Sequence, residues 1–191
     1  MIVNERETSE IPSYGVVIIG AGVSGLYQLY KSREIGVSAL VLESGTDVGG
    51  TWYWNRYPGA RFDSESYSYG YSFSQDLLDQ WDWQERFSAQ PENLRYLQHV
   101  TEELDLRSDI RFKSVVTQCT FDETSNEWQI EVEDGFRVRC RFLVTAIGIL
   151  SKPLIPDFDG MKDFKGPSFH TAQWPHDEVV FTGKRVGIIG T

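Results

Sequence analysis

Hydrophobic positions change their spacing twice within the first fifty residues. Residues 14–20 (YGVVIIG) form an apolar run that ends in glycine, which is typical of a buried strand. In the next segment, 24–36, Leu26 and Leu29 recur at helical spacing and Gly36 marks the end of the predicted helix. A second apolar run, SALVLE, indicates another buried strand. A strand, a glycine-rich turn, a helix and a strand make a βαβ unit, which predicts an α/β fold with a parallel sheet.

An irregular region and a second helix follow. Residues 44 to about 90 show no regular period and are rich in Gly, Tyr, Trp and Ser. An irregular insert of that length in a compact domain is usually functional. Pro91 then opens a predicted helix, with Leu94, Leu97 and Leu104 along one side.

The region after this helix predicts an antiparallel excursion from the sheet, because apolar and polar residues alternate along it. A turn at Asp134–Gly135 is expected to join the last two strands of the excursion. The final strand ends in FLVTAIG, an apolar run suited to the centre of a sheet. SKPLIP is predicted to be a stiff linker and KRVGIIGT a new strand. The expected strands cover residues 110–123, 127–133, 136–148 and 184–191.

Composition and net charge limit the classes of partner that the protein is expected to bind. The chain has 191 residues, 40% of them hydrophobic, and a formal net charge of -10, which predicts a globular protein. A negative surface repels phosphate backbones and anionic lipids, so we expect neither nucleic acid nor membrane as a partner. The acidic N-terminus lacks the features of a secretory signal. Cys119 and Cys140 stand outside any Cys/His cluster, so we expect reduced thiols, a cytoplasmic protein and no metal site.

The turn between the first strand and the first helix carries the sequence GAGVSG. In a dinucleotide-binding turn, Gly20 permits the tight bend, Gly22 lets a pyrophosphate approach the backbone, and Gly25 lets helix and strand pack closely. Glu43 ends the next strand, where a carboxylate can accept bonds from both ribose hydroxyls. An acid there disfavours a 2′-phosphate, so the motif predicts FAD or NAD rather than NADP. The alternative is a merely glycine-rich turn.

Three other features suit a binding site but also have ordinary explanations. The segment Gly49–Trp52 allows close contact with a cofactor, or describes an aromatic loop packed on the core. Asp63 alone is typical of a solvated turn or a helix cap. His170 alone is typical of an exposed or satisfied linker histidine.

Together these segments resemble a known family. Residues 50–63 match GxWxxxx(F/Y)P(G/M)xxxD and residues 164–175 match FxGxxxHxxxW(P/D), at every fixed position. Both are motifs of type I Baeyer–Villiger monooxygenases, and the resemblance covers almost the whole chain after the N-terminal tail. Related N-oxygenating flavin monooxygenases share the first half of the second motif but lack its Trp-Pro ending. The fixed positions of the second motif are Phe164, Gly166, His170, Trp174 and Pro175.

The resemblance implies a Rossmann-like FAD-binding domain, whose parallel sheet carries the antiparallel β excursion, followed by the start of a second Rossmann-like domain that binds NADP. It divides the chain into a flexible tail, the N-terminal part of the FAD-binding domain, an interdomain linker and the first strand of the NADP-binding domain. The second glycine motif is expected to continue beyond Gly190, as in the N-terminal portion of a longer enzyme. The boundaries of the four segments are 1–13, 14–150, 151–183 and 184–191.

The implied reaction inserts one oxygen atom of O2 next to the carbonyl of a ketone to give an ester or lactone. FAD and NADPH are the implied cofactors, and a flavin peroxide is the family's oxygenating species. The remainder of the same enzyme is the implied partner, and we expect the segment alone to be inactive. Two alternatives stay open, an N- or S-oxygenating flavin monooxygenase and a non-catalytic FAD-binding module.

Site residues carry over from the family by position. Asp63 is implied to orient the catalytic arginine, which lies downstream in the family, and His170 to act at the junction between domains. Arg61 and Asp63 are implied to border the nicotinamide, and the backbone of Val116 to meet the adenine. The implied cofactor-binding set is Gly20, Gly22, Ser24, Gly25, Glu43, Gly50, Thr51, Trp52, Arg61, Asp63, Tyr69, Val116 and Gly190.

Overall fold

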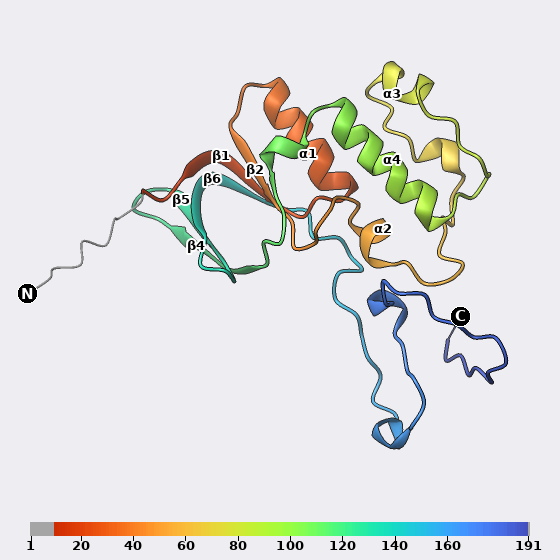
Figure 1. The fold of residues 1–191 in the computed structure, drawn as a ribbon. Helices are drawn as coiled ribbons and strands as arrows, with labels where there is room; N and C mark the ends of the chain where they lie inside the picture. Colours follow the sequence, from red (N-terminus) through yellow and green to blue (C-terminus); the bar gives the residue numbers. More distant parts are fainter. Residues whose placement is uncertain (1–9, 191) are drawn as a thin grey trace, which may run out of the picture.

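A six-stranded mixed sheet flanked by helices organises residues 10–190, the part of the chain that this computed structural model describes (Figure 1). The strand order is β3-β2-β1-β6-β5-β4. The pairs β1–β2, β1–β6 and β2–β3 are parallel, whereas β4–β5 and β5–β6 are antiparallel. The predicted α/β fold with an antiparallel excursion is therefore confirmed, and β6 lies at the centre of the sheet as expected. The strands are β1 (Ser13–Ile19), β2 (Ala39–Leu42), β3 (Ile110–Arg111), β4 (Val116–Asp122), β5 (Glu127–Val132) and β6 (Arg137–Thr145). The helices are α1 (Val23–Glu34), α2 (Thr51–Trp54), α3 (Gln75–Asp79) and α4 (Gln90–Glu103), with short 3-10 turns η1 (Ser66–Ser68), η2 (Arg107–Asp109), η3 (Met161–Asp163) and η4 (Thr171–Gln173).

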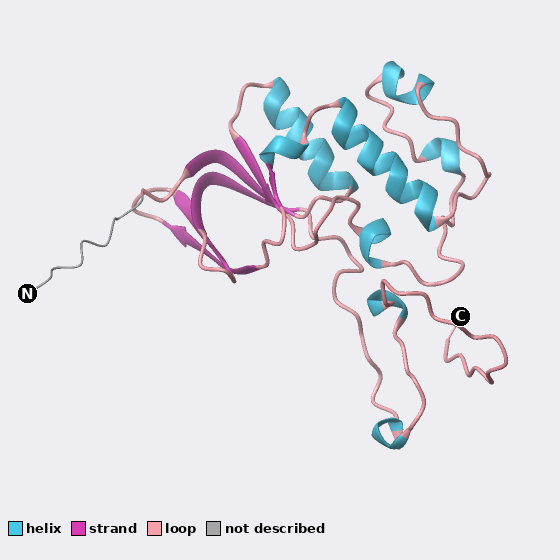
Figure 2. Ribbon diagram, in the orientation of Figure 1, coloured by secondary structure: helices cyan, strands magenta, loops and turns pink. Residues whose placement is uncertain are grey.

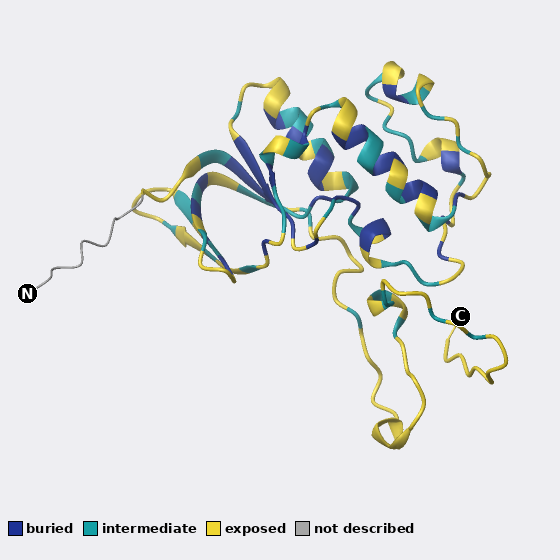
Figure 3. Ribbon diagram, viewed as in Figure 1, coloured by how far each residue is buried: buried dark blue, intermediate teal, exposed yellow. Residues whose placement is uncertain are grey.

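One hydrophobic core lies between the sheet and the two long helices. Val16 and Ile18 of β1 pack with Leu26 and Leu29 of α1, and Leu97 of α4 belongs to the same cluster. All five side chains are at most 6% exposed. The periodic apolar positions predicted for both helices therefore pack against the sheet. Figure 3 shows buried and exposed residues alternating along α1 and α4.

A second core lies on the opposite face of the parallel strands. Val17 of β1 and Leu42 of β2 cluster there with Ile130, Val138 and Cys140 of the antiparallel excursion. Since successive side chains of a strand point to opposite faces, β1 and β2 are buried on both sides. This explains why their sequences are continuous apolar runs instead of alternating ones.

The predicted strand 110–123 divides in two. β3 has only two residues, and the chain turns away at Lys113, where φ is 54°. The backbone N–H groups of Lys113 and Ser114 donate to the carbonyls of Gly45 and Glu43, each at 2.8 Å. These bonds hold the chain to the end of β2 before β4 begins, so a tertiary contact interrupts a sequence that reads as one strand.

The predicted strand 184–191 is wrong for the residues that the structure describes. Residues 184–190 form no strand, and Ile188 and Ile189 are 83% and 80% exposed. An apolar run becomes a strand only beside another strand that pairs with its backbone, and none of the described strands pairs with this run. After β6 the described chain is loop apart from the 3-10 turns η3 and η4 (Figure 2). Thr191 and residues 1–9 of the predicted tail lie outside the described residues, while Ser13 already belongs to β1.

Within the described part of the chain, no helix combines the length and apolar character that crossing a membrane requires.

Candidate functional site

The glycine-rich turn joins β1 to α1 at the carboxyl edge of the parallel strands. Gly20 has φ of 101°, in the left-handed region that favours glycine. Its N–H donates to the carbonyl oxygen of Leu42 at 2.9 Å. A Cβ on Gly25 would lie 1.9 Å from the Gly20 carbonyl oxygen, so only glycine fits there. α1 begins after Gly22, and no side chain of the described residues caps it. The first N–H groups of the helix are therefore available to an anion.

The two predicted glycine motifs meet in space. A Cβ on Gly50 would come within 2.7 Å of the Gly22 Cα, and Gly50 itself has φ of 50°. The N–H of Gly49 donates to the Ala21 carbonyl at 3.0 Å. The turn before α1 and the turn before α2 thus form one glycine-lined surface, which lets a ligand approach the backbone closely.

Glu43, which directly follows β2, connects the end of this strand to the turn before α1. Its side chain is 3% exposed, and its Oε2 accepts a hydrogen bond from the Ala21 N–H at 2.7 Å. Its Oε1 accepts one from the Gly45 N–H, also at 2.7 Å. Each carboxylate oxygen offers two acceptor sites, so Glu43 can hold the turn and still accept from a hydroxyl group.

An aromatic cluster stands beside the glycine-lined surface. The indole Nε1 of Trp52 donates to the Tyr69 hydroxyl at 2.7 Å, and the ring of Phe62 meets the Trp52 ring edge-on at a centroid distance of 4.9 Å. Burial raises the pKa of the Tyr69 hydroxyl above its ordinary value. Tyr69 therefore stays neutral and keeps Trp52 in one orientation.

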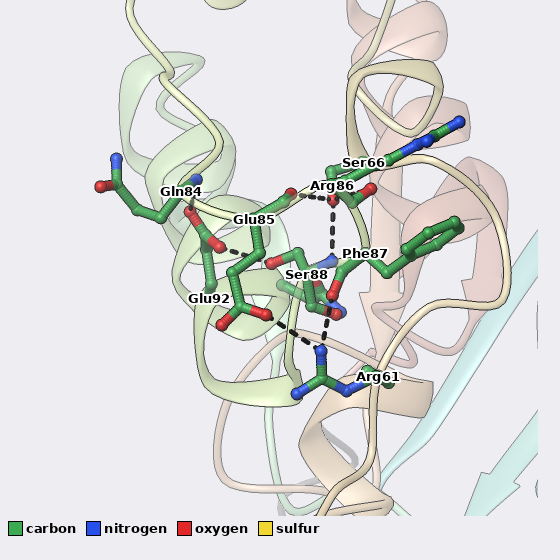
Figure 4. A network of polar contacts seen from close by, with 9 residues as sticks. Arg61, Ser66, Gln84, Glu85, Arg86, Phe87, Ser88 and Glu92 are labelled. Carbon is green, nitrogen blue, oxygen red and sulfur yellow. Dashed lines mark hydrogen bonds and ion pairs between the residues drawn. The ribbon is translucent and has the colours of Figure 1, made fainter.

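Arg61 and Asp63 lie on the segment between α2 and η1, and both are exposed. The Nη1 of Arg61 donates to the Glu85 carboxylate at 2.9 Å and to the Phe87 carbonyl at 3.1 Å (Figure 4). The structure therefore fixes Arg61 through a neighbouring segment and leaves Asp63 open to solvent.

The segment that carries the second motif contacts the rest of the chain through a histidine that the sequence did not single out. Arg56, which follows α2, hydrogen-bonds to Nδ1 of His176. His170 instead uses its Nδ1 to accept from the N–H of Ala172 at 3.2 Å, as the cap of η4. Trp174 packs on Phe169 at a centroid distance of 5.4 Å. His176 directly follows the Trp-Pro ending of the motif, and this position was the one available indication in the sequence.

The structure brings together most of the predicted cofactor-binding residues but not all of them. Gly20, Gly22 and Gly25 share one turn, which Glu43 and Gly50 contact directly. Ser24 and Thr51 are exposed in the first turns of α1 and α2, and Val116 is the first residue of β4. Gly190 is exposed in the C-terminal segment, and a Cβ there would meet nothing within 4 Å.

This arrangement fits the ADP part of a dinucleotide. It offers uncapped helical N–H groups, a backbone surface kept free of Cβ atoms and an oriented carboxylate at the end of the next strand. No group of three or more His, Cys, Asp or Glu residues within positions 10–190 is arranged to hold a metal ion.

Comparison with known proteins decides between the possible families. A model of the flavin-binding monooxygenase-like proteins matches residues 14–191. The chain belongs to this family.

The relatives of this flavin-binding monooxygenase-like chain include a ketone monooxygenase and an N-monooxygenase. The chain is 48% identical over 173 residues to acetone monooxygenase (methyl acetate-forming) of Gordonia sp. (strain TY-5), covering 91% of this chain and 32% of that protein. It is 43% identical over 179 residues to phenazine N-monooxygenase PhzNO1 of Lysobacter antibioticus, covering 93% and 33%.

Solved structures of such monooxygenases share the fold. A crystal structure of OTEMO in complex with FAD and NADP superposes with a TM-score of 0.88 at 45% identity, covering 95% of this chain and 35% of that one. The chain thus spans about a third of the length of the relatives that it matches.

Proposed function

We propose that this chain is the FAD-binding part of an NADPH-dependent Baeyer–Villiger monooxygenase. The observation that carries the proposal is the contact between Gly22 and Gly50, which joins the dinucleotide turn to the motif 50–63. Independent support comes from the second motif, 164–175, and from a relative whose name gives methyl acetate as the product of acetone. The substrate class is a ketone, and O2 supplies the inserted oxygen atom.

The residues around the glycine-lined surface suit the parts of FAD. The pyrophosphate would lie on Gly22 and the first turn of α1, and the ribose would meet Glu43. Thr51, Trp52 and Tyr69 would border the flavin, where the buried Trp52 ring excludes water. FAD, when bound, supplies the redox chemistry that activates O2.

Asp63 and Arg61 are proposed to meet the nicotinamide of NADPH. The exposed Asp63 carboxylate is free to accept hydrogen bonds from a guanidinium and so orient the arginine that the family places downstream. Gly190 would begin the NADPH site, which the remaining polypeptide of the enzyme would complete. The two free thiols support a cytoplasmic location.

N-oxygenation is the second candidate, because phenazine N-monooxygenase is 43% identical to this chain. Both reactions use the same cofactors, so the products distinguish them. The test uses the complete polypeptide that carries this sequence, with FAD, NADPH and ¹⁸O-labelled O2. Baeyer–Villiger activity gives one labelled oxygen in the ester formed from acetone or a cyclic ketone. A labelled N-oxide with no ester from any ketone would favour the second candidate. If neither product forms, a non-catalytic FAD-binding module is the remaining alternative.

His170 has a proposed conformational role at the junction before the NADPH site. Its side chain caps η4, close to the packed Trp174. We expect His170→Ala to keep FAD and the fold yet lose most of the ester formed per NADPH consumed. Loss of bound FAD would indicate a direct role in flavin binding, and unchanged ester yield would show that His170 is an ordinary linker residue.

A further inference from the structure

A buried polar network joins the segment 84–92 to Ser66, three residues after Asp63 (Figure 4). Its members are Ser66, Ser88 and Glu92, which are 1%, 0% and 7% exposed. Glu92 belongs to the first turn of α4, where a carboxylate interacts favourably with the helix N-terminus. A buried carboxylate costs free energy unless its oxygens are satisfied, so its partners indicate what it holds.

Glu92 fixes both ends of the segment 84–88. Its Oε1 accepts from the Gln84 N–H at 3.0 Å, and its Oε2 accepts from the Ser88 hydroxyl at 2.6 Å. The Ser88 carbonyl also accepts from the Asn93 side chain at 3.2 Å. Glu85, the residue that holds Arg61, lies between these two ends.

Ser66 joins this segment to the one that carries Asp63. Its hydroxyl shares one proton between the carbonyl oxygens of Glu85 and Arg86, at 2.8 Å and 3.0 Å. The hydroxyl oxygen accepts a hydrogen bond from the Ser88 N–H at 2.8 Å. Its own N–H donates to the Arg86 carbonyl at 2.8 Å. The two segments therefore cannot separate without leaving buried polar groups unpaired.

The chain around Asp63 is held at both sides of this residue. Phe62 donates its N–H to the Ser88 carbonyl at 3.1 Å, and Ser66 is bonded to Arg86. Only residues 63–65 lie between these two attachment points. Asp63 therefore sits on a three-residue loop, and the positions of the loop ends are set by Ser88 and Ser66.

We propose that Glu92, Ser88 and Ser66 are positioning residues for Asp63: the buried carboxylate of α4 fixes the loop from which Asp63 reaches the nicotinamide site. The consequence for catalysis rests on the proposed function. The hydrogen-bond connection from Glu92 to residues 62–66 does not depend on the proposed function, and it is measured separately.

The first measurement is amide hydrogen exchange by mass spectrometry in the complete polypeptide. Glu92→Gln keeps the size of the side chain but removes its negative charge, so the Gln84 N–H and the Ser88 hydroxyl no longer donate to a charged acceptor. Peptides spanning 61–66 are expected to exchange about tenfold faster, as for a lost hydrogen bond to a charged group. Glu103→Gln, an exposed change on the same helix, is the control and leaves exchange unchanged. Faster exchange confined to 84–92 would overturn the proposal.

The second measurement is the ester formed per NADPH consumed, with bound FAD and Tm recorded in parallel. Ser88→Ala and Glu92→Gln are expected to keep FAD but lower the ester yield by about tenfold, and Ser88→Thr, which restores a hydroxyl, to recover part of it. A lower Tm with unchanged ester yield would reduce the network to a structural role and overturn the inference. If the unmodified enzyme forms no ester from any ketone, the proposed function fails, while the exchange experiment still tests the link.

Discussion

Gly22 and Gly25 are expected to fail in different ways when each is replaced by alanine. A Cβ at position 25 would lie 1.9 Å from the Gly20 carbonyl oxygen. Since favourable contacts between heavy atoms lie at about 3.5 Å, α1 would have to move by roughly 1.6 Å from the turn. Overpacking of this kind costs about 3 kcal/mol or more. Gly25→Ala should therefore lower the free energy of unfolding and cofactor content together.

Gly22 tests the ligand instead of the fold. It has φ of -86°, a backbone conformation that any residue adopts. Its Cβ would lie 3.3 Å from the Gly50 Cα, so a shift of about 0.2 Å restores normal contact and costs less than about 1 kcal/mol. A bound pyrophosphate would lose one or two charge-assisted hydrogen bonds of about 1.5–3 kcal/mol each. FAD should then bind at least about tenfold more weakly to Gly22→Ala, while the protein stays folded.

The assay is FAD titration of the deflavinated complete polypeptide, followed by flavin fluorescence, with urea unfolding of both variants. Gly22→Ala should unfold at nearly the same urea concentration as the unmodified protein but purify with little yellow colour. A Gly22→Ala protein with unchanged FAD affinity would refute the placement of the pyrophosphate at this turn. Normal stability of Gly25→Ala would refute the packing argument.

Three further predictions concern individual side chains. Tyr69→Phe leaves the buried indole N–H of Trp52 without an acceptor and should lower the free energy of unfolding by about 1–2 kcal/mol in urea titrations; an unchanged midpoint would contradict this. Burial raises the pKa of the Cys140 thiol to about 11, so alkylation of the folded protein should be slow at pH 8 and rise with pH. The contribution of the protonated Cys140 thiol to the free energy of unfolding is complete below about pH 8.5 and is lost as the pH rises through the pKa of the folded protein. Rapid alkylation of Cys140 in the native protein at pH 8, located by peptide mass spectrometry, would contradict the burial. His176→Ala removes the contact with Arg56 and should speed proteolysis within 150–190 without loss of FAD, whereas an unchanged cleavage rate would show that the contact does not anchor this segment.

The sequence alone determined the features that depend on neighbouring residues. The βαβ unit follows from apolar runs and helical spacing, and the roles of Gly20 and Gly25 follow from a turn of six residues. Local periodicity is enough for these features because each element buries its apolar residues in a fixed repeat. The two motifs of the resemblance also indicated a flavin-dependent monooxygenase, and the match to the flavin-binding monooxygenase-like family confirms that broader assignment.

Tertiary structure decided what depends on contacts between distant residues. The run at 184–190 has the composition of a strand but forms none, because pairing needs a neighbouring strand that composition cannot supply. The single run 110–123 is broken by bonds to Gly45 and Glu43. The contact between Arg56 and His176 cannot be read from a local pattern, since 120 positions separate the two residues. Glu92 likewise reads as an ordinary acid at a helix start, and only the buried position of its carboxylate between Gln84 and Ser88 shows that it holds a loop. A local repeat specifies which face of an element is buried. The residues that contact this face are set by the packing of the whole chain.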